Sequence, residues 1–192
     1  MTDVNLERGY RRVLSGVNFT VAAGELWQLA GANGVGKTSL IRALAGLVKI
    51  GLEGEIVCNV SLLYQGHALA LKPLLTAEEN LQFHPSGGVS REREAINHAL
   101  ETVGLAGYET QPVNQLSAGQ QRRVGLARLW LDDARLWLLD EPFTAIDVVG
   151  AALLESRITE HVADGGSVIF TSHQDSRFGE ALQTLDLARY AP

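Results

Sequence analysis

Apolar runs of strand length alternate with helix-like patterns along most of this 192-residue chain. Continuous apolar stretches bounded by glycines predict strands, and segments whose apolar residues recur every three or four positions predict helices. We predict strands at 17–23, 26–30, 62–64, 135–139, 167–171 and 185–187, and helices at 38–47, 90–103, 151–161 and from 76 onward. Such alternation predicts an α/β fold with a parallel sheet.

The middle of the chain, from about 68 to 131, is rich in helix signals and lies between strand-rich segments. Thr76 and Glu79 have the spacing of a capping box, which marks a helix start. The simplest architecture is therefore a single domain, 1–192, in which a helical lobe is inserted into an α/β core.

Composition and charge narrow the functional classes. The formal net charge of −6 argues against a nucleic-acid partner, because neutralising phosphates requires clustered Lys and Arg. The single Cys58 cannot form an internal disulfide, which is consistent with the cytosol. No signal sequence is expected at the polar start of the chain, and the apolar runs are far shorter than the roughly 20 residues that span a bilayer. We therefore expect any membrane role to come through a partner.

The segment 31–38, Gly-Ala-Asn-Gly-Val-Gly-Lys-Thr, matches the phosphate-binding P-loop pattern in full. Glycines let backbone N–H groups turn inward and form a nest for the β- and γ-phosphates at a helix N-terminus. Lys37 adds a positive charge, and the Thr38 hydroxyl is placed to bind Mg²⁺. An ordinary glycine turn is the alternative, but this loop follows a predicted strand and begins a predicted helix. The predicted nucleotide-binding residues here are Gly31, Ala32, Asn33, Gly34, Val35, Gly36, Lys37, Thr38 and Ser39.

A second motif, 136–142, is an apolar strand that ends in two carboxylates. Its strand is expected to bring Asp140 to the metal beside Thr38. Glu141 would then polarise a water molecule aimed at the γ-phosphate. The alternative is that both carboxylates are simply solvated, but the presence of a P-loop in the same chain favours the catalytic interpretation.

A third motif, 116–123, begins with Leu-Ser-Ala-Gly-Gln. Ser117 and Gln120 have capping-box spacing, so a helix with free N–H groups starts here. A well-capped surface helix is the alternative. At this point the sequence resembles the ABC ATPase family, whose signature is Leu-Ser-Gly-Gly-Gln, with Ala118 at the first glycine.

The resemblance implies a P-loop NTPase nucleotide-binding domain with a RecA-like core, an antiparallel β subdomain and an inserted helical lobe. It implies ATP and Mg²⁺ as cofactors and a head-to-tail homodimer that sandwiches two ATP molecules. In that dimer Ser117, Gly119 and Gln120 contact the γ-phosphate of the ATP held by the other subunit. Asp147 matches the acid of the family's D-loop. His173 matches its switch histidine and would act in catalysis with Glu141 and Lys37.

Two family positions leave alternatives open. At the junction with the helical lobe the family has Gln, whereas the spacing here favours His67, with Gln65 as the alternative. Tyr10 is the candidate for stacking on adenine, or else a packed turn residue.

The blocks 62–81 and 112–147 are similar to ATP-binding subunits of cytochrome c maturation systems, and 48–59 is shorter than expected there. This implies a peripheral protein on the cytoplasmic face of the inner membrane, bound to an integral membrane transporter subunit. ATP hydrolysis would drive haem export or release of a haem-loaded chaperone. The alternative is an ABC motor that serves a different membrane partner and substrate.

Overall fold

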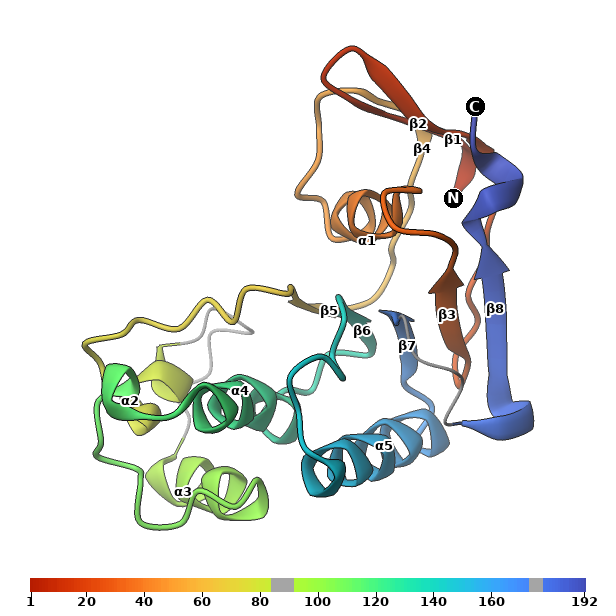
Figure 1. The fold of residues 1–192 in the computed structure, drawn as a ribbon. Coiled ribbons are helices and arrows are strands. Elements are labelled where there is room, and N and C mark those ends of the chain that lie inside the picture. Colours follow the sequence, from red (N-terminus) through yellow and green to blue (C-terminus); the bar gives the residue numbers. More distant parts are fainter. Residues whose placement is uncertain (84–91, 173–177) are drawn as a thin grey trace. The chain divides into compact units, whose positions relative to one another are not determined.

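The computed structural model describes residues 1–83, 92–172 and 178–192 (Figure 1). The chain forms two compact units. The first comprises Met1–His67, Ala134–Pro142 and Glu160–Pro192, and the second comprises Ala68–Asp133 and Phe143–Thr159. The second unit thus contains the helix-rich stretch 68–131 together with a later segment that the sequence pattern does not assign to it. A single functional domain over the whole chain stays a prediction.

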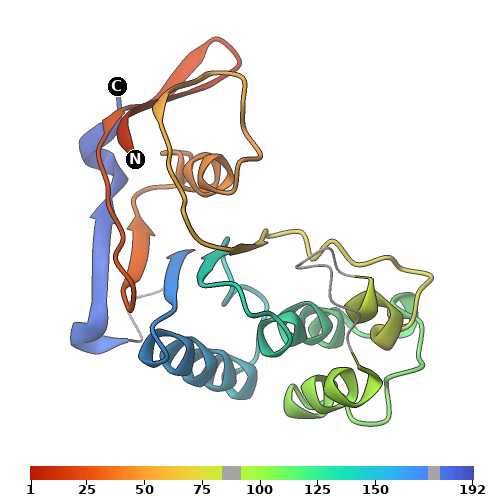
Figure 2. The same ribbon diagram turned by 180° about the vertical axis from the view of Figure 1, so that it is seen from behind.

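A five-stranded parallel sheet lies in the first unit (Figure 1; seen from behind in Figure 2). Its strands, in spatial order, are β5 (Leu62–Gln65), β6 (Leu136–Leu139), β7 (Ser167–Thr171), β3 (Leu26–Ala30) and β8 (Leu182–Asp186). Every residue of β6 and β7 is buried, as expected for a parallel sheet covered on both faces. All five strands were expected from apolar runs, within a few residues at their ends. Their carboxyl ends meet at one edge of the sheet.

The first unit also contains an antiparallel sheet in the order β2-β1-β4. Its strands are β1 (Thr2–Arg8), β2 (Arg11–Val17) and β4 (Leu52–Glu55). The strand predicted at 17–23 is wrong, because β2 ends at Val17 and no ladder forms between there and β3. Phe19 and Val21 pack into the core from an irregular connection, so burial without strand pairing explains the apolar run.

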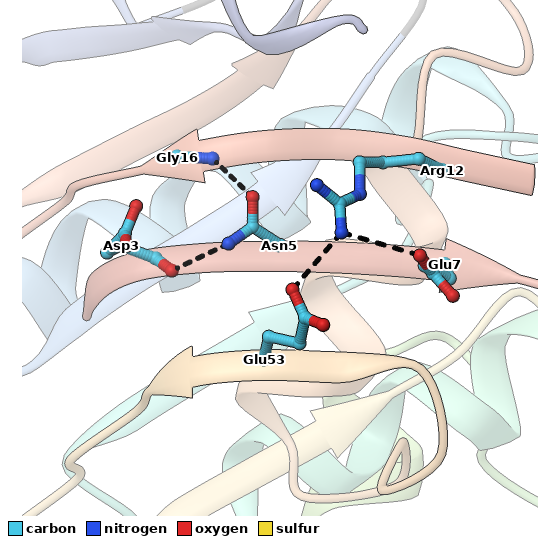
Figure 3. A network of polar contacts seen from close by, with 6 residues as sticks. All are labelled: Asp3, Asn5, Glu7, Arg12, Gly16 and Glu53. Carbon is cyan, nitrogen blue, oxygen red and sulfur yellow. Dashed lines mark hydrogen bonds and ion pairs between the residues drawn. The ribbon is translucent and has the colours of Figure 1, made fainter.

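Polar side chains join the three antiparallel strands (Figure 3). The β1–β2 register shifts by one residue near Asn5, whose side-chain oxygen accepts the Gly16 N–H at 3.0 Å. Arg12 on β2 reaches Glu7 on β1 at 3.5 Å and Glu53 on β4 at 3.2 Å. Exposed ion pairs of this kind contribute about 0.2–1 kcal/mol each. The register therefore depends mainly on the backbone ladder and on four buried side chains: Val4, Leu6, Leu14 and Val17.

Helix α1 (Lys37–Leu44) packs in the first unit between residues of both sheets. Its Leu40 and Ile41 are fully buried, in the same core cluster as Leu14 of the antiparallel sheet and Leu138 of the parallel sheet. The helix is shorter than the predicted 38–47, because the chain turns into the left-handed region at Gly46. The start of α1 is thereby fixed between the two sheets.

The described part of the second unit is helical. Its elements are α2 (Ala77–Gln82), α3 (Arg93–Thr102), α4 (Ala118–Ala127) and most of α5 (Val148–Ala163), whose residues from Glu160 on belong to the first unit. Both capping boxes are present, Thr76 with Glu79 at α2 and Ser117 with Gln120 at α4. The predicted helix 90–103 is α3, although 90 and 91 lie outside the described residues. Among the residues that the structure describes, no helix has both the length and the apolar composition to span a membrane.

Candidate functional site

The predicted phosphate-binding loop connects the carboxyl end of β3 to the first residue of α1. Gly36 lies in the left-handed region, with φ of 119°. A Cβ atom at this position would lie 2.8 Å from Cγ1 of Val13, so any larger residue would collide with β2 as well as strain the backbone. Glycine at 36 thus allows the loop to pass directly beside the antiparallel sheet.

Lys37 folds back over this loop. Its Nζ donates to the carbonyl oxygens of Gly31 at 2.5 Å and Ala32 at 3.2 Å, and the side chain is only 6% exposed. Burial lowers the pKa of the Lys37 ammonium, and the charges of Glu141 and Asp140 oppose that shift. The ammonium is therefore held at the mouth of the loop, where it can bind an anion.

Asp140 follows β6 at the carboxyl edge of the parallel sheet and is 2% exposed. Its Oδ1 accepts the hydroxyl of Thr38 at 3.2 Å and that of Thr171 at 2.8 Å. Its Oδ2 is buried and has no hydrogen-bond partner among the residues that the structure describes. A buried carboxylate is costly unless its charge is compensated, so a cation fits beside Oδ2. The described residues contain no cluster of three His, Cys, Asp or Glu, and Mg²⁺ needs none, because it binds through one or two carboxylates and substrate phosphates.

Glu141 adopts a left-handed conformation, with φ of 52°, which is strained for a residue with a Cβ atom. Its N–H donates to the Thr171 hydroxyl at 2.8 Å, and this bond helps to hold the conformation. The carboxylate lines the same cavity as Lys37 and Thr38, and lies 4.0 Å from Nδ1 of His67. Strained residues of this kind cluster at functional sites.

The two candidates for the lobe junction, Gln65 and His67, have different surroundings. Gln65 pairs with Leu139 in the parallel ladder, so its side chain lies on the sheet face opposite to Leu138 and Asp140. It is 5% exposed, and among the described residues neither its Oε1 nor its Nε2 has a hydrogen-bond partner. The structure places His67 beside the Glu141 carboxylate, whereas Gln65 does not line the cavity that Glu141 lines.

A cavity of about 830 Å³ extends from the phosphate loop to the antiparallel sheet. It is lined by loop residues, Lys37, Thr38 and Glu141, by the aliphatic side chains of Val13, Val48 and Ile50, and by residues 6–9, which include the charged Glu7 and Arg8. Tyr10 is fully exposed in the β1–β2 turn and does not line this cavity. The sequence did not identify the aliphatic residues, because Val13 belongs to β2 and the other two belong to the connection between α1 and β4.

Arg42 also lines the cavity and was not expected there. It follows Thr38 by four residues in α1, and residues at this spacing share one face of a helix. Its Nε donates to the Tyr64 hydroxyl at 3.4 Å. Helical spacing from Thr38 is the signal that could have identified it.

A second group of predicted residues lies in the second unit, at the start of α4. The Ser117 Oγ accepts the Gln120 N–H at 3.2 Å, and Gln120 Oε1 accepts the Ser117 N–H at 2.9 Å. These residues and Gly119 line a cavity of about 450 Å³. The helix N-terminus is thus well formed and open to a ligand.

Asp147 caps the start of α5, and Arg123 of α4 lies beside it. The Asp147 Oδ1 accepts the Gly150 N–H at 2.9 Å, and its Oδ2 lies 2.5 Å from Arg123. These contacts, that of Gly150 first, lower the pKa of the Asp147 carboxyl. Arg123 therefore links the predicted signature helix to the predicted D-loop. The predicted switch residue His173 lies outside the described residues.

Comparison with known proteins decides the family. The profile of the ABC transporter family matches residues 14–144, about two thirds of the chain. The chain belongs to the ABC transporter family. It is 51% identical over 184 residues to the cytochrome c biogenesis ATP-binding export protein CcmA 2 of Salmonella paratyphi A, covering 90% of this chain and 87% of that protein. Its identity to CcmA of Escherichia coli K12 is 48% over 187 residues, or 91% and 88% of the two chains.

Solved structures agree with this family assignment. A putative ABC transporter ATP-binding protein from Pyrococcus furiosus superposes with a TM-score of 0.82 at 25% identity, covering 100% of this chain and 98% of that chain. A dimeric ATP-binding cassette in a post-hydrolysis state, bound to ADP and Pi, superposes with a TM-score of 0.79 at 24% identity, over 97% and 93%. The expected P-loop NTPase fold of an ABC nucleotide-binding domain is confirmed.

Proposed function

We propose that this chain is the ATP-hydrolysing subunit of an ABC transporter complex for cytochrome c biogenesis. Its ATP turnover would drive haem export or the release of a haem-loaded chaperone. The observation that carries the enzymatic part is the group formed by Lys37, Thr38 and Glu141 along one cavity, with the buried Asp140 accepting the hydroxyl of Thr38. The similarity to the CcmA proteins, at about 50% identity over nine tenths of the chain, supports the biological part.

The residues of the first unit would divide the chemistry between them. The N–H groups of residues 31–36 and the Lys37 ammonium bind the β- and γ-phosphates and hold them in place. Thr38 and Asp140 hold Mg²⁺, which when bound neutralises phosphate charge. Glu141 orients a water molecule toward the γ-phosphate and accepts its proton, and His173 contacts the γ-phosphate.

The second group of residues would act on a neighbouring copy. In a head-to-tail homodimer, Ser117, Gly119 and Gln120 of one copy contact the γ-phosphate of ATP bound to the other. The N-terminal end of α4, where the helix dipole is positive, favours a negatively charged group. ATP would close the pair, and hydrolysis would open it.

We further propose that the chain binds peripherally at the cytoplasmic face of the inner membrane, through an integral membrane subunit of the cytochrome c maturation system. The names of the similar CcmA proteins describe an ATP-binding export protein, which requires a partner that crosses the membrane. The net charge of −6 supports a protein partner rather than a nucleic acid.

The first test replaces the phosphate-binding lysine in a host strain whose only copy of this gene carries Lys37→Ala. We expect loss of covalently bound haem from the c-type cytochromes, seen by haem staining, at unchanged levels of the subunit. Lys72→Ala, at an exposed lysine of the second unit, is the matched control and should leave staining normal. Normal cytochromes c in the Lys37→Ala strain, alongside lost ATPase activity of the purified variant, would reject the biogenesis role and leave an ABC motor for another substrate.

A further inference from the structure

Among the described residues that line the nucleotide cavity of the first unit, none is aromatic. The charged Glu7 and Arg8 of β1 line this cavity, and we call three of its apolar lining residues, Val13, Val48 and Ile50, the aliphatic wall. Val13 belongs to β2, and the other two residues belong to the connection between α1 and β4. The only aromatic residue near it in the sequence, Tyr10, is fully exposed and lies outside the cavity lining.

The aliphatic wall begins where the phosphate-binding loop ends. Gly36 lies so close to β2 that a Cβ atom there would be 2.8 Å from Cγ1 of Val13. A nucleoside triphosphate whose phosphates occupy the loop would therefore pass beside Val13. The base would then lie in the rest of the cavity, which Val48, Ile50 and residues 6–9 line.

Ile50 is held beside β1 by the backbone and not by its own side chain. The next residue, Gly51, accepts the Glu7 N–H at 2.7 Å and has φ of 74°. A Cβ atom at Gly51 would lie 2.9 Å from the Glu7 carbonyl oxygen, so only glycine fits this close approach. The Ile50 side chain is left 93% exposed while it lines the cavity.

The strands that flank the wall are joined by polar contacts (Figure 3). Arg12, the residue before Val13, bridges Glu7 of β1 and Glu53 of β4. The pairing of β2, β1 and β4 thus fixes where Val13 lies relative to Ile50. When a flat ring covers an exposed apolar side chain in a preformed cavity, apolar surface is removed from water, and this stabilises the complex.

We propose that the aliphatic wall holds the base of the bound nucleoside triphosphate by apolar contact with the ring face, and that the ring of Tyr10 does not. This inference rests on the proposed ATP site, because the phosphates define where the base lies. Ile50 would contribute most to this contact, since its side chain is the most exposed of the three and would lose the most exposed surface.

The test compares ATP with inorganic tripolyphosphate, which has phosphates but no base, by isothermal titration calorimetry with Mg²⁺. Ile50→Asn should raise the Kd for ATP about tenfold and leave the Kd for tripolyphosphate unchanged. Tyr10→Ala should change neither Kd. Val57→Asn, at an exposed valine outside the nucleotide cavity, is the matched control and should also change neither. Because Ile50 is exposed, thermal unfolding of Ile50→Asn should match that of the wild type.

Two results would overturn the inference alone: an unchanged Kd for ATP in Ile50→Asn, or a tenfold weaker Kd in Tyr10→Ala. A rise in both Kd values for Ile50→Asn would also reject it, since the wall would then affect the phosphates. Lys37→Ala separates this failure from that of the proposed function. It should weaken both ligands, and if it weakens neither, the ATP site itself is wrong and the inference falls with it.

Discussion

One buried hydroxyl group connects the two carboxylate residues of the candidate active site. The Thr171 oxygen accepts the Glu141 N–H and donates to Asp140 Oδ1, both at 2.8 Å. Thr171 is fully buried at the end of β7, so water does not replace these bonds. The bond to the backbone of Glu141 offsets part of the left-handed strain, which is of the order of 1–3 kcal/mol. Thr171 is thus a positioning residue for the carboxylate that would orient water.

We predict that Thr171→Val separates positioning from binding. Loss of the hydroxyl leaves a buried N–H unpaired, which should lower the free energy of unfolding by about 1–3 kcal/mol in urea titrations. The kcat for ATP should fall about tenfold or more with little change in KM, because Glu141 is displaced while the phosphate loop is intact. Thr171→Ser retains the hydroxyl and should keep most of the activity. Unchanged kcat in a destabilised Thr171→Val would show a structural role only.

At the scale of elements, the chain uses the same capping box twice for different purposes. At α2 the Thr76 side chain accepts the Glu79 N–H at 3.1 Å, in a partly buried setting. At α4 the corresponding bond of Ser117 is exposed and lines a cavity. Both caps satisfy backbone groups that a helix leaves open at its start. The second cap differs in that its residues line a cavity, where the proposed γ-phosphate contact would be made.

We therefore predict a different outcome for two equivalent substitutions. Thr76→Ala and Ser117→Ala should each lower the free energy of unfolding by about 1 kcal/mol, measured by urea titration. Only Ser117→Ala should also reduce ATP turnover, because its hydroxyl would contact the γ-phosphate held by the other copy. Equal losses of activity in both variants would mean that Ser117 serves helix stability alone.

At the scale of the whole molecule, the candidate residues fall into two groups that belong to different units. Lys37, Asp140 and Glu141 are in the first, and Ser117 with Gln120 is in the second. In the proposed homodimer, each ATP would lie between one group of each kind from two copies. Closure would then require ATP to favour the closed state by several kcal/mol.

Glu141→Gln should arrest this cycle with ATP bound. It removes the group that accepts the proton from water but keeps the phosphate-binding residues, so the ATP-bound pair should persist. Size-exclusion chromatography with Mg²⁺ and ATP should show a dimer for this variant and a monomer for the double variant Lys37→Ala, Glu141→Gln. A monomer for Glu141→Gln at saturating ATP would contradict closure of two free copies.

Features that depend on neighbouring residues could be predicted from the sequence alone. The phosphate loop, the strand that ends in Asp140 and Glu141, and both capping boxes each lie within about eight consecutive residues. Backbone torsions, the spacing of apolar residues and short-range hydrogen bonds specify such segments. The strands β6 and β7 of the parallel sheet were predicted for a related reason, since full burial makes each a continuous apolar run.

The tertiary structure alone decided which distant residues meet. Thr171 reaches Asp140 because β7 lies beside β6 in register, and Gln65 lies on the sheet face opposite to Asp140 because its ladder partner is Leu139. The aliphatic wall comes together only when a loop pairs with β1 and β2 passes the phosphate loop. The resemblance implied an antiparallel β subdomain, but the positions of its strands were missed because their alternation is short and irregular, and the apolar run at 17–23 is an unpaired connection. Register and long-range contact are set by the packing of the whole first unit, which no short segment of sequence contains.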